Sequence, residues 1–285
     1  MSLKAIAIAT VVLVATIAAL ILYGAQRWQS DTKKLLMRME AAYIPIAPST
    51  YDPRELEGLP ASVQRYFRAV LSEGQPFVTA VSVEHTGTFN MSEAGEQWAP
   101  FTSTQRVVTR RPGFVWDARV RMAPGVTVHV HDAYVAGEGL LTAKLFGLLT
   151  VMNQSPTPEL AQGELIRFLA EAPWYPTVLL PSQGVTWEEI DDSRASATLA
   201  DGATTVTLVF QFGADGLISS VQSEGRYTEV QGALVAVPWQ GRHWDYELRD
   251  GMLVPTEGEV AWLRPDGARP YWRGRISSLS YHLVE

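Results

Sequence analysis

The first hydrophobic run lies near the N-terminus and carries no charge. Residues 5–23 read AIAIATVVLVATIAALILY, and a helix of this length spans about 28 Å, close to the ~30 Å hydrocarbon core of a bilayer. The run is longer than the apolar part of a typical signal peptide, and Tyr23 stands where a cleavage site needs a small residue. We therefore expect residues 1–25 to form an uncleaved transmembrane helix, a signal-anchor, with a cleaved signal peptide as the alternative.

Basic residues on both sides of this run bear on its orientation. Lys4 precedes the run, and Arg27, Lys33, Lys34 and Arg38 come after it. A count of the bases close to the membrane favours a cytoplasmic body. A very short N-terminal tail is nevertheless easily retained inside the cell, and a single N-terminal segment commonly exports the rest of its chain. We expect a single-pass protein of the cytoplasmic membrane whose soluble domain is extracytoplasmic.

The pattern after this run predicts a connector and then a β-rich body. Residues 26–57 form the expected connector, in which residues 32–42 are compatible with a helix. Residues 58–285 form the expected body, which opens with an amphipathic helix and then alternates polar and apolar positions, as in residues 204–212 (TTVTLVFQF). Turn signals, such as the Asp-Gly pair at residues 250–251, separate about twelve or thirteen strand segments.

One further helix is predicted at residues 157–172, between two series of strands. Leu165, Phe168, Leu169 and Ala172 form its apolar stripe, and we expect its charged residues to face away from that stripe. These charged residues are Glu164, Arg167 and Glu171.

Many strands with few helices predict a mainly β protein. Strands and helices do not alternate, so a doubly wound parallel sheet is excluded. A sheet of this many strands has to curl or close to protect its edges. We expect a curved antiparallel sheet that forms an open half-barrel, in addition to the N-terminal transmembrane helix.

Several motifs in this body resemble a known family. Residues 59–67 (LPASVQRYF), 114–119 (FVWDAR), 167–176 (RFLAEAPWYP) and 251–262 (GMLVPTEGEVAW) resemble an uncharacterised bacterial family, a domain of unknown function. The hairpin at residues 249–256 gives a more distant similarity to the LolA/LolB-like lipoprotein-carrier fold. That similarity implies an open half-barrel with helices across its mouth and a hydrophobic ligand.

Charge and composition narrow the function classes. The formal charge is −7, divided into +3 in residues 1–40 (five bases, two acids) and −10 in residues 41–285 (18 bases, 28 acids). An acidic body argues against nucleic acid as a partner. The chain has no Cys, which excludes a thiol nucleophile, and it has no glycine-rich phosphate loop, so no cofactor is expected.

Polar pairs in the strands supply weak candidates for chemistry. His129 and His131 project from one face of a strand and could share a metal ion, although no third ligand is apparent and a solvated strand face is the simpler interpretation. Asp117, Arg119, Glu171 and Glu259 are the candidates for acid–base chemistry. If the strands carrying Asp117 and Arg119 neighboured the strand carrying Glu259, Arg–carboxylate pairs would form between them.

Aromatic residues give the remaining signal, because eight of the nine Trp come after residue 97. They are compatible with ordinary core packing or with an apolar cavity rimmed by arginine. The apolar run at residues 139–152 is too short to span a bilayer and predicts a buried strand, or a cavity wall or membrane-touching lid. The candidate ligand-binding residues are Trp116, Trp174, Tyr175, Trp262, Arg119 and Arg273.

Three functional hypotheses remain open from the sequence. The first is a membrane-anchored binding module for an apolar or lipid-like molecule, with the membrane itself as a partner. The second is an enzyme that acts on an amphiphilic small molecule. The third is a structural envelope protein with a fully packed core and no ligand.

Overall fold

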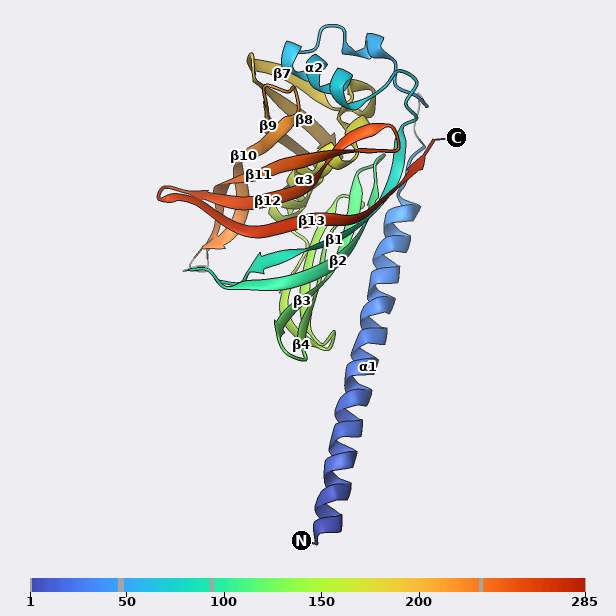
Figure 1. Ribbon diagram of the computed structural model, residues 1–285, viewed down its shortest axis with the longest axis vertical. Coiled ribbons are helices and arrows are strands. Elements are labelled where there is room, and N and C mark those ends of the chain that lie inside the picture. Colours follow the sequence, from blue (N-terminus) through green and yellow to red (C-terminus); the bar gives the residue numbers. More distant parts are fainter. Residues whose placement is uncertain (1, 46–48, 93–94, 231–232, 285) are drawn as a thin grey trace.

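The computed structural model describes residues 2–45, 49–92, 95–230 and 233–284, and its body is one antiparallel sheet (Figure 1). The sheet has thirteen strands in the order β6-β5-β4-β3-β2-β1-β13-β12-β11-β10-β9-β8-β7. Because β6 and β7 are not paired with each other, the sheet stays open, as the sequence predicted. The strands are β1 Val78–Asn90, β2 Trp98–Val108, β3 Gly113–Ala123, β4 Val126–Val135, β5 Glu138–Leu145, β6 Leu149–Gln154, β7 Thr186–Asp191, β8 Arg194–Asp201, β9 Thr204–Phe212, β10 Ile218–Val230, β11 Ala233–Arg249, β12 Met252–Arg264 and β13 Gly267–Leu283.

The strand order consists of two meanders joined at the centre. Strands β1 to β6 succeed one another from the centre outward on one side, strands β7 to β13 succeed one another from the edge inward on the other, and β1 pairs with β13 at the centre. The chain must therefore cross from edge β6 to edge β7. It does so through α3 (Pro158–Glu171), which begins at the Thr157 N-cap and packs against β4, β5, β9 and β10. Topology thus places α3 across the concave face of the sheet.

Period-two alternation curves the sheet around one buried face. On β9 the residues Val206, Leu208, Phe210 and Phe212 are buried, whereas Thr205 and Thr207 are exposed. The same inward positions on the other strands join α3 and α2 (Ala61–Val70) in one hydrophobic core. Four short 3₁₀ segments complete it: η1 Pro53–Leu56, η2 Ala172–Trp174, η3 Pro176–Leu179 and η4 Pro181–Gln183.

The N-terminal helix α1 (Leu3–Ala41) is continuous for 39 residues and projects far beyond the body (Figure 1). It is long and apolar enough to cross a membrane, since its most apolar window has a mean hydropathy of 2.9 and no buried residue. Its other half runs along the convex face of the sheet, where Trp28 and Met39 are 1% exposed. The same helix therefore traverses the expected anchor and enters the expected connector, of which residues 46–48 lie outside the described residues.

One expectation for an individual segment needs correction. Residues 139–152 are not one buried strand but parts of a hairpin, in which β6 is exposed over its full length because it is an edge strand. Residues 226–237 are divided between β10 and β11, and residues 231–232 lie outside the described residues. The side of α3 that lies away from its apolar stripe is also covered by the sheet, since Glu164 is 2% exposed.

Candidate functional site

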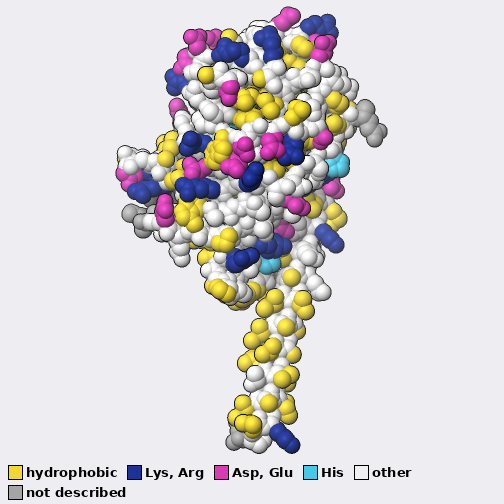
Figure 2. Space-filling view, in the orientation of Figure 1, with side chains coloured by type: hydrophobic (Ala, Val, Ile, Leu, Met, Phe, Trp, Pro, Cys, Tyr) yellow, Lys and Arg dark blue, Asp and Glu magenta, His cyan; other side chains and the backbone are white. Residues whose placement is uncertain are grey.

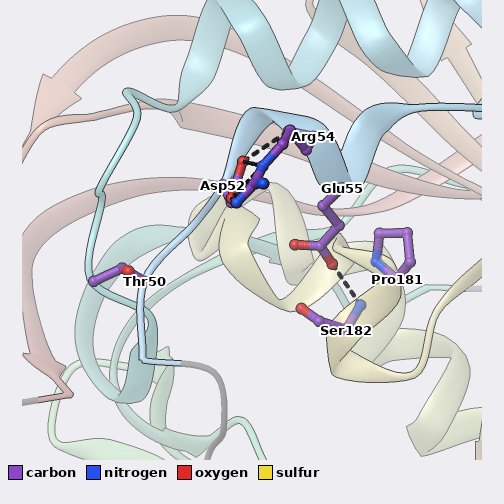
Figure 3. Close-up of a pocket in the computed structure, with 6 residues that line it drawn as sticks. All are labelled: Thr50, Asp52, Arg54, Glu55, Pro181 and Ser182. Atoms are coloured by element: carbon purple, nitrogen blue, oxygen red, sulfur yellow. Dashed lines mark hydrogen bonds and ion pairs between the residues drawn. The ribbon is translucent and has the colours of Figure 1, made fainter.

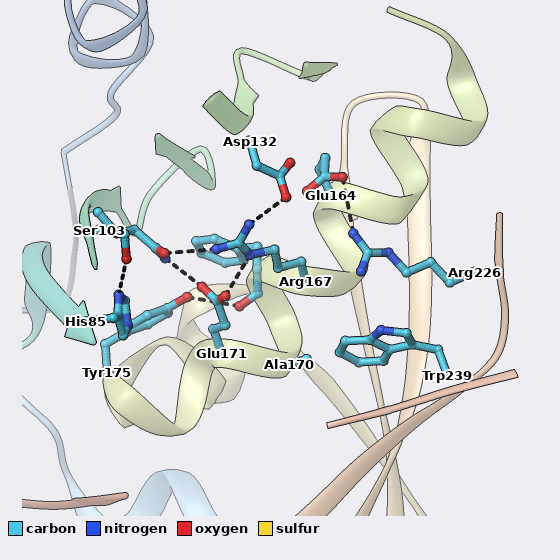
Figure 4. Close-up of polar contacts among 12 residues, drawn as sticks. His85, Ser103, Asp132, Glu164, Arg167, Ala170, Glu171, Tyr175, Arg226 and Trp239 are labelled. Carbon is cyan, nitrogen blue, oxygen red and sulfur yellow. Dashed lines mark hydrogen bonds and ion pairs between the residues drawn. The ribbon is translucent and has the colours of Figure 1, made fainter. Parts of the chain in front are cut away.

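The charged side of α3 makes the main polar site of the concave face (Figure 4). Arg167 is at its centre, and its guanidinium contacts three polar side chains. Arg167 Nη1 donates to Asp132 Oδ2 over 2.7 Å, Nε donates to Glu171 Oε1 over 2.7 Å, and Nη2 donates to Gln105 Oε1 over 3.1 Å. Gln105 also donates to Glu171 Oε2 over 2.6 Å. This network ties α3 to strands β2 and β4.

A second arginine joins α3 to the other half of the sheet. Arg226 of β10 donates through Nη2 to Glu164 Oε1 over 3.2 Å and through Nη1 to the Tyr271 hydroxyl over 3.2 Å. Trp239 Nε1 donates to the same hydroxyl over 2.9 Å, and the guanidinium lies 5.4 Å from the centre of the Trp239 ring. The two arginines therefore connect the charged side of α3 to strands in both halves of the sheet.

Burial and charge together determine the protonation of Glu164. Burial raises its pKa well above the ordinary value, and the neighbouring Asp132 carboxylate raises it further. Glu164 Oε2 and Asp132 Oδ1 have no hydrogen-bond partner among the described residues. A raised pKa favours the neutral form of Glu164, whose proton could serve as a donor toward Asp132.

Aromatic rings line the concave face around this cluster. The Arg167 guanidinium lies 4.7 Å from the ring centre of Phe114 and 5.2 Å from that of Trp116. The rings become half-buried toward the end of the sheet at which β1 ends, near Phe89. There Trp262 stacks on Tyr271, with ring centroids 5.7 Å apart. The ring centroid of Phe89 also lies 5.7 Å from that of Tyr271. The aromatic wall thus extends from the buried ion pairs to a partly exposed end.

The remaining ligand-binding candidates lie elsewhere. Trp174 and Tyr175 are buried, at 4% and 0% exposure, rather than at an open mouth. The Tyr175 hydroxyl donates to the Phe168 carbonyl over 3.0 Å, and Trp174 packs 5.1 Å from His85 between ring centres. Both residues therefore hold the end of α3 against the core.

The candidate residues on the convex face of β3 and β4 form the site at which α1 packs on the sheet. The Trp28 ring stacks on His131, and its Nε1 donates to Asp117 Oδ1 over 2.8 Å. Thr32 Oγ1 lies 3.0 Å from Asp117 Oδ2 and 2.7 Å from His131 Nε2. Arg119 forms an ion pair with Asp117. The alternate spacing correctly placed His129 and His131 on one face of the strand. It did not indicate that α1 covers this face.

This environment keeps both imidazoles neutral. Burial lowers the pKa of His131 to about 4, and burial with the nearby Arg119 lowers that of His129 to about 4. Among the described residues there is no group of three or more His, Asp or Glu placed to hold a metal ion. Both imidazoles pack against Trp28 of α1.

The four acid–base candidates are not brought together. Glu171 faces the concave interior, whereas Asp117 and Arg119 lie under α1 on the convex face. Glu259 is on the convex face of β12, where Arg273 Nε donates to its Oε2 over 2.7 Å and Arg273 also lies over Trp98. The condition for Arg–carboxylate pairs between the strands of Arg119 and Glu259 is not met, because β2, β1 and β13 separate β3 from β12.

Two surface pockets lie away from these groups. One, of about 670 Å³, is lined by Thr50, Asp52, Arg54, Glu55, Pro181 and Ser182 (Figure 3). There Ser182 donates its backbone N–H to Glu55 Oε1 over 2.5 Å. The residues that line this pocket include no histidine that could act as a base for the Ser182 hydroxyl. The other, of about 390 Å³, lies between α3 and strands β8 to β10. Neither is lined by any of the six ligand-binding candidates.

The fold and this site define an open antiparallel half-barrel with a charged helix across its concave face. Residues 57–281 match the model of a family of unknown function (DUF6920). The chain belongs to this family, in agreement with the motifs that suggested an uncharacterised domain.

Solved structures show distant similarity. A lipoprotein-sorting protein domain described as of the outer membrane, from Vibrio parahaemolyticus, is 11% identical, with a TM-score of 0.36 over 71% of this chain and 85% of that one. A LolA superfamily protein from Nitrosomonas europaea is 12% identical, with a TM-score of 0.34 over 79% and 94%. A beta-barrel-like DUF1849 protein from Brucella abortus has a TM-score of 0.21 at 12% identity, over 72% and 99%. No curated protein matches the chain.

Sequence reasoning missed several members of the concave cluster. Asp132 occupies an inward position of β4, in phase with Val130 and Tyr134. A lone carboxylate at an apolar position needs a buried partner, and this signal was available from the strand period. Arg226, by contrast, lies on a strand whose phase shifts at a bulge between residues 223 and 226, so its direction could not be obtained from alternation. Gln105, Trp239 and Tyr271 were missed as well.

Proposed function

We propose that this protein is a membrane-anchored binding module that takes up an apolar or amphiphilic, lipid-like molecule on the concave face of its half-barrel, beneath α3. The observation that carries this proposal is the polar contact between α3 and an otherwise aromatic wall. A helix that serves only to fill a core presents apolar side chains to the sheet. Besides its apolar stripe, α3 presents Glu164, Arg167 and Glu171 to the sheet.

The energetics of this polar contact favour reversible separation of α3 from the sheet. A buried ion pair contributes less than well-packed apolar groups of the same size, because removing both charges from water offsets much of their attraction. The rings of Phe114, Trp116 and Trp239 remain as an apolar surface for the tail of an amphiphile, and the arginines remain as donors for its polar part. The half-exposed Trp262 and Tyr271 mark the end at which entry is easiest.

The full-length protein in lipid nanodiscs tests this proposal. Native mass spectrometry and displacement of a fluorescent fatty acid are expected to report one bound amphiphile per chain. Trp262→Ala, at the half-buried end of the wall, should lower its occupancy, while Trp244→Ala on the convex face, where Trp244 is 38% exposed, should leave it unchanged. Bare protein with no displacement signal would contradict the proposal and favour a packed structural protein.

The anchor and its topology belong to the same proposal. The projecting half of α1 supports a single span, since hydrophobic side chains cover it without protein contacts (Figure 2). We place the body outside the cytoplasm, with Lys4 on the cytoplasmic side of the span. A C-terminal alkaline-phosphatase fusion should be active and a C-terminal fluorescent-protein fusion dark; the reverse result would place the body in the cytoplasm.

A further inference from the structure

The last turn of the apolar run in α1 is fixed to the body. Gly24 comes directly after Tyr23, the end of that run, and there is no room for a side chain on it. A Cβ on Gly24 would lie 2.3 Å from the Phe146 carbonyl oxygen and 2.6 Å from Leu148 Cγ. Gly147, at φ +70°, is also in close contact with α1, because a Cβ there would lie 2.8 Å from the Gly24 oxygen. The β5–β6 turn is therefore in contact with α1 at the point where the apolar run ends.

This contact sets the height of the turn relative to a bilayer. If residues 5–23 span the hydrocarbon core, Gly24 lies at its surface, and so does the β5–β6 turn. The β3–β4 turn lies at the same end of the strands, since Phe146 N donates to the Thr127 carbonyl over 3.0 Å. Farther along α1, Met39 packs with Val108 and Val115, so the body extends away from this level.

The two turns and the adjoining strand expose apolar side chains. Leu149 is 63% exposed, Val151 59%, Met152 47% and, on β3 beside its turn, Met122 40%. Exposed apolar residues gathered at one end of a molecule mark an interaction surface. Figure 2 shows hydrophobic side chains at the lower end of the body, beside the projecting helix.

The charge of these segments differs from that of the body as a whole. Residues 118–131 contain Arg119 and Arg121 and no acid, and residues 139–158 contain Lys144 and no acid. The body from residue 41 onward is nevertheless strongly acidic, with 28 acids against 18 bases. Arg119 pairs with Asp117 and Lys144 pairs with Asp31, whereas Arg121 has no ion pair among the described residues. A base near the end of a span is attracted by anionic lipid headgroups, so Arg121 adds a favourable charge to this end of the body.

We infer that the β3–β4 turn, the β5–β6 turn and strand β6 form a second membrane-contact surface, which rests on an anionic bilayer and holds the half-barrel in a fixed orientation. This inference rests on the proposed anchor. It adds that the body is not tethered by a flexible linker: the contacts of α1 run from Gly24 through Trp28 and Arg38 to Met39. The occupant of the apolar surface is the bilayer interface, because the span itself brings that interface to the turns.

The absence of Cys makes a direct test possible, since each introduced Cys is a unique labelling site. Full-length Leu149→Cys and Met122→Cys proteins carry an environment-sensitive fluorophore in liposomes of phosphatidylcholine and phosphatidylglycerol. We expect blue-shifted emission and loss of intensity when lipids with a headgroup nitroxide are added. Leu248→Cys is the matched control, because Leu248 is 72% exposed at the opposite end of the strands, beside the β11–β12 turn. Its emission should not change.

A probe in the span separates the two proposals. Val12→Cys should be quenched by lipids with a nitroxide in mid-chain. If Val12 is quenched while Leu149 and Met122 behave like Leu248, the anchor holds and the second surface is refuted. If Val12 is not quenched, the anchor itself fails. A blue shift at Leu149 that depends on protein density and resists lipid quenching would assign the surface to a second copy of the chain and overturn the inference.

Discussion

Trp28 of α1 stacks on His131 of β4, with ring centroids 3.8 Å apart and ring planes inclined by 16°. The two residues are 103 positions apart in a chain of 285, and their contact joins the N-terminal helix to the convex face of the half-barrel. Asp117 accepts a hydrogen bond from Trp28 Nε1, and its other carboxylate oxygen lies 3.8 Å from His131 Nε2. The helix and the sheet are therefore one structural unit.

Replacement of Trp28 tests how strongly this unit is held. Trp28→Ala removes a 1% exposed ring and its hydrogen bond, and should lower the free energy of unfolding by about 3–5 kcal/mol. Guanidinium unfolding in a mild detergent, followed by near-UV circular dichroism, measures this loss. The matched Trp244→Ala, on an exposed ring with one hydrogen bond, should cost about 1 kcal/mol. Equal losses would mean that α1 adds nothing to the stability of the body.

Gly24, at the start of the segment of α1 that packs on the sheet, should respond to alanine substitution with a loss of stability. In the interior of an exposed helix, Gly→Ala stabilises by about 1 kcal/mol. Gly24→Ala should instead destabilise by about 1–3 kcal/mol, because the new Cβ overlaps the Phe146 carbonyl and Leu148. Thermal unfolding of the detergent-solubilised protein provides the measurement. Ser30→Ala, on the exposed side of the same helix, is the control and should be neutral or slightly stabilising.

Two glutamates about two turns apart on α3 should respond differently to conversion into glutamine. Burial and Asp132 raise the pKa of Glu164, which favours its neutral form, so Glu164→Gln should keep a neutral donor and change stability by less than about 1 kcal/mol. Glu171 pairs with Arg167 at 2.7 Å, and Glu171→Gln leaves a buried guanidinium with one counter-charge fewer, at a cost of about 3–5 kcal/mol. Urea unfolding compares them. A large loss for Glu164→Gln would show that Glu164 is ionised.

Acid should weaken the docking of α1. The folded-state pKa of His131 is lowered from 6.5 to about 4, mainly by burial. Because the unfolded chain then binds the proton more readily, its contribution is fully present above pH 6.5 and is lost as the pH falls toward 4, by about 3 kcal/mol in all. Stability measured from pH 7 to pH 4 should fall less steeply in His131→Gln. The exposed His282→Gln serves as the control, and an unchanged slope in His131→Gln would refute the assignment.

Local sequence was sufficient for most elements of the fold. The alternation in residues 204–212 gave β9, the Asp-Gly pair at 250–251 gave the β11–β12 turn, and Thr157 marked the start of α3. These features depend on side-chain period and turn chemistry, which act between near neighbours. The exposure of β6 was not foreseen, because only the strand order makes it an edge.

Of the candidate site residues, local sequence identified some that lie in the concave cluster and others that lie elsewhere. Trp116 and Glu171 were identified and lie in the concave cluster, but Asp117, Arg119, His129 and His131 face α1, and Glu259 pairs with Arg273. Strand period correctly assigned residues to one face or the other. It could not say which face is concave or what covers each one.

The sequence by itself determined an apolar N-terminal run, a β-rich body, its hairpins and the family motifs, because these arise from patterns within a few residues of one another. Only the tertiary structure decided that α3 buries its charges against the concave face and that α1 packs on the convex face. Both outcomes depend on the pairing of β1 with β13, which leaves β6 and β7 as separate edges. The chain must then bridge the opening with a helix, and long-range pairing of this kind has no local signal.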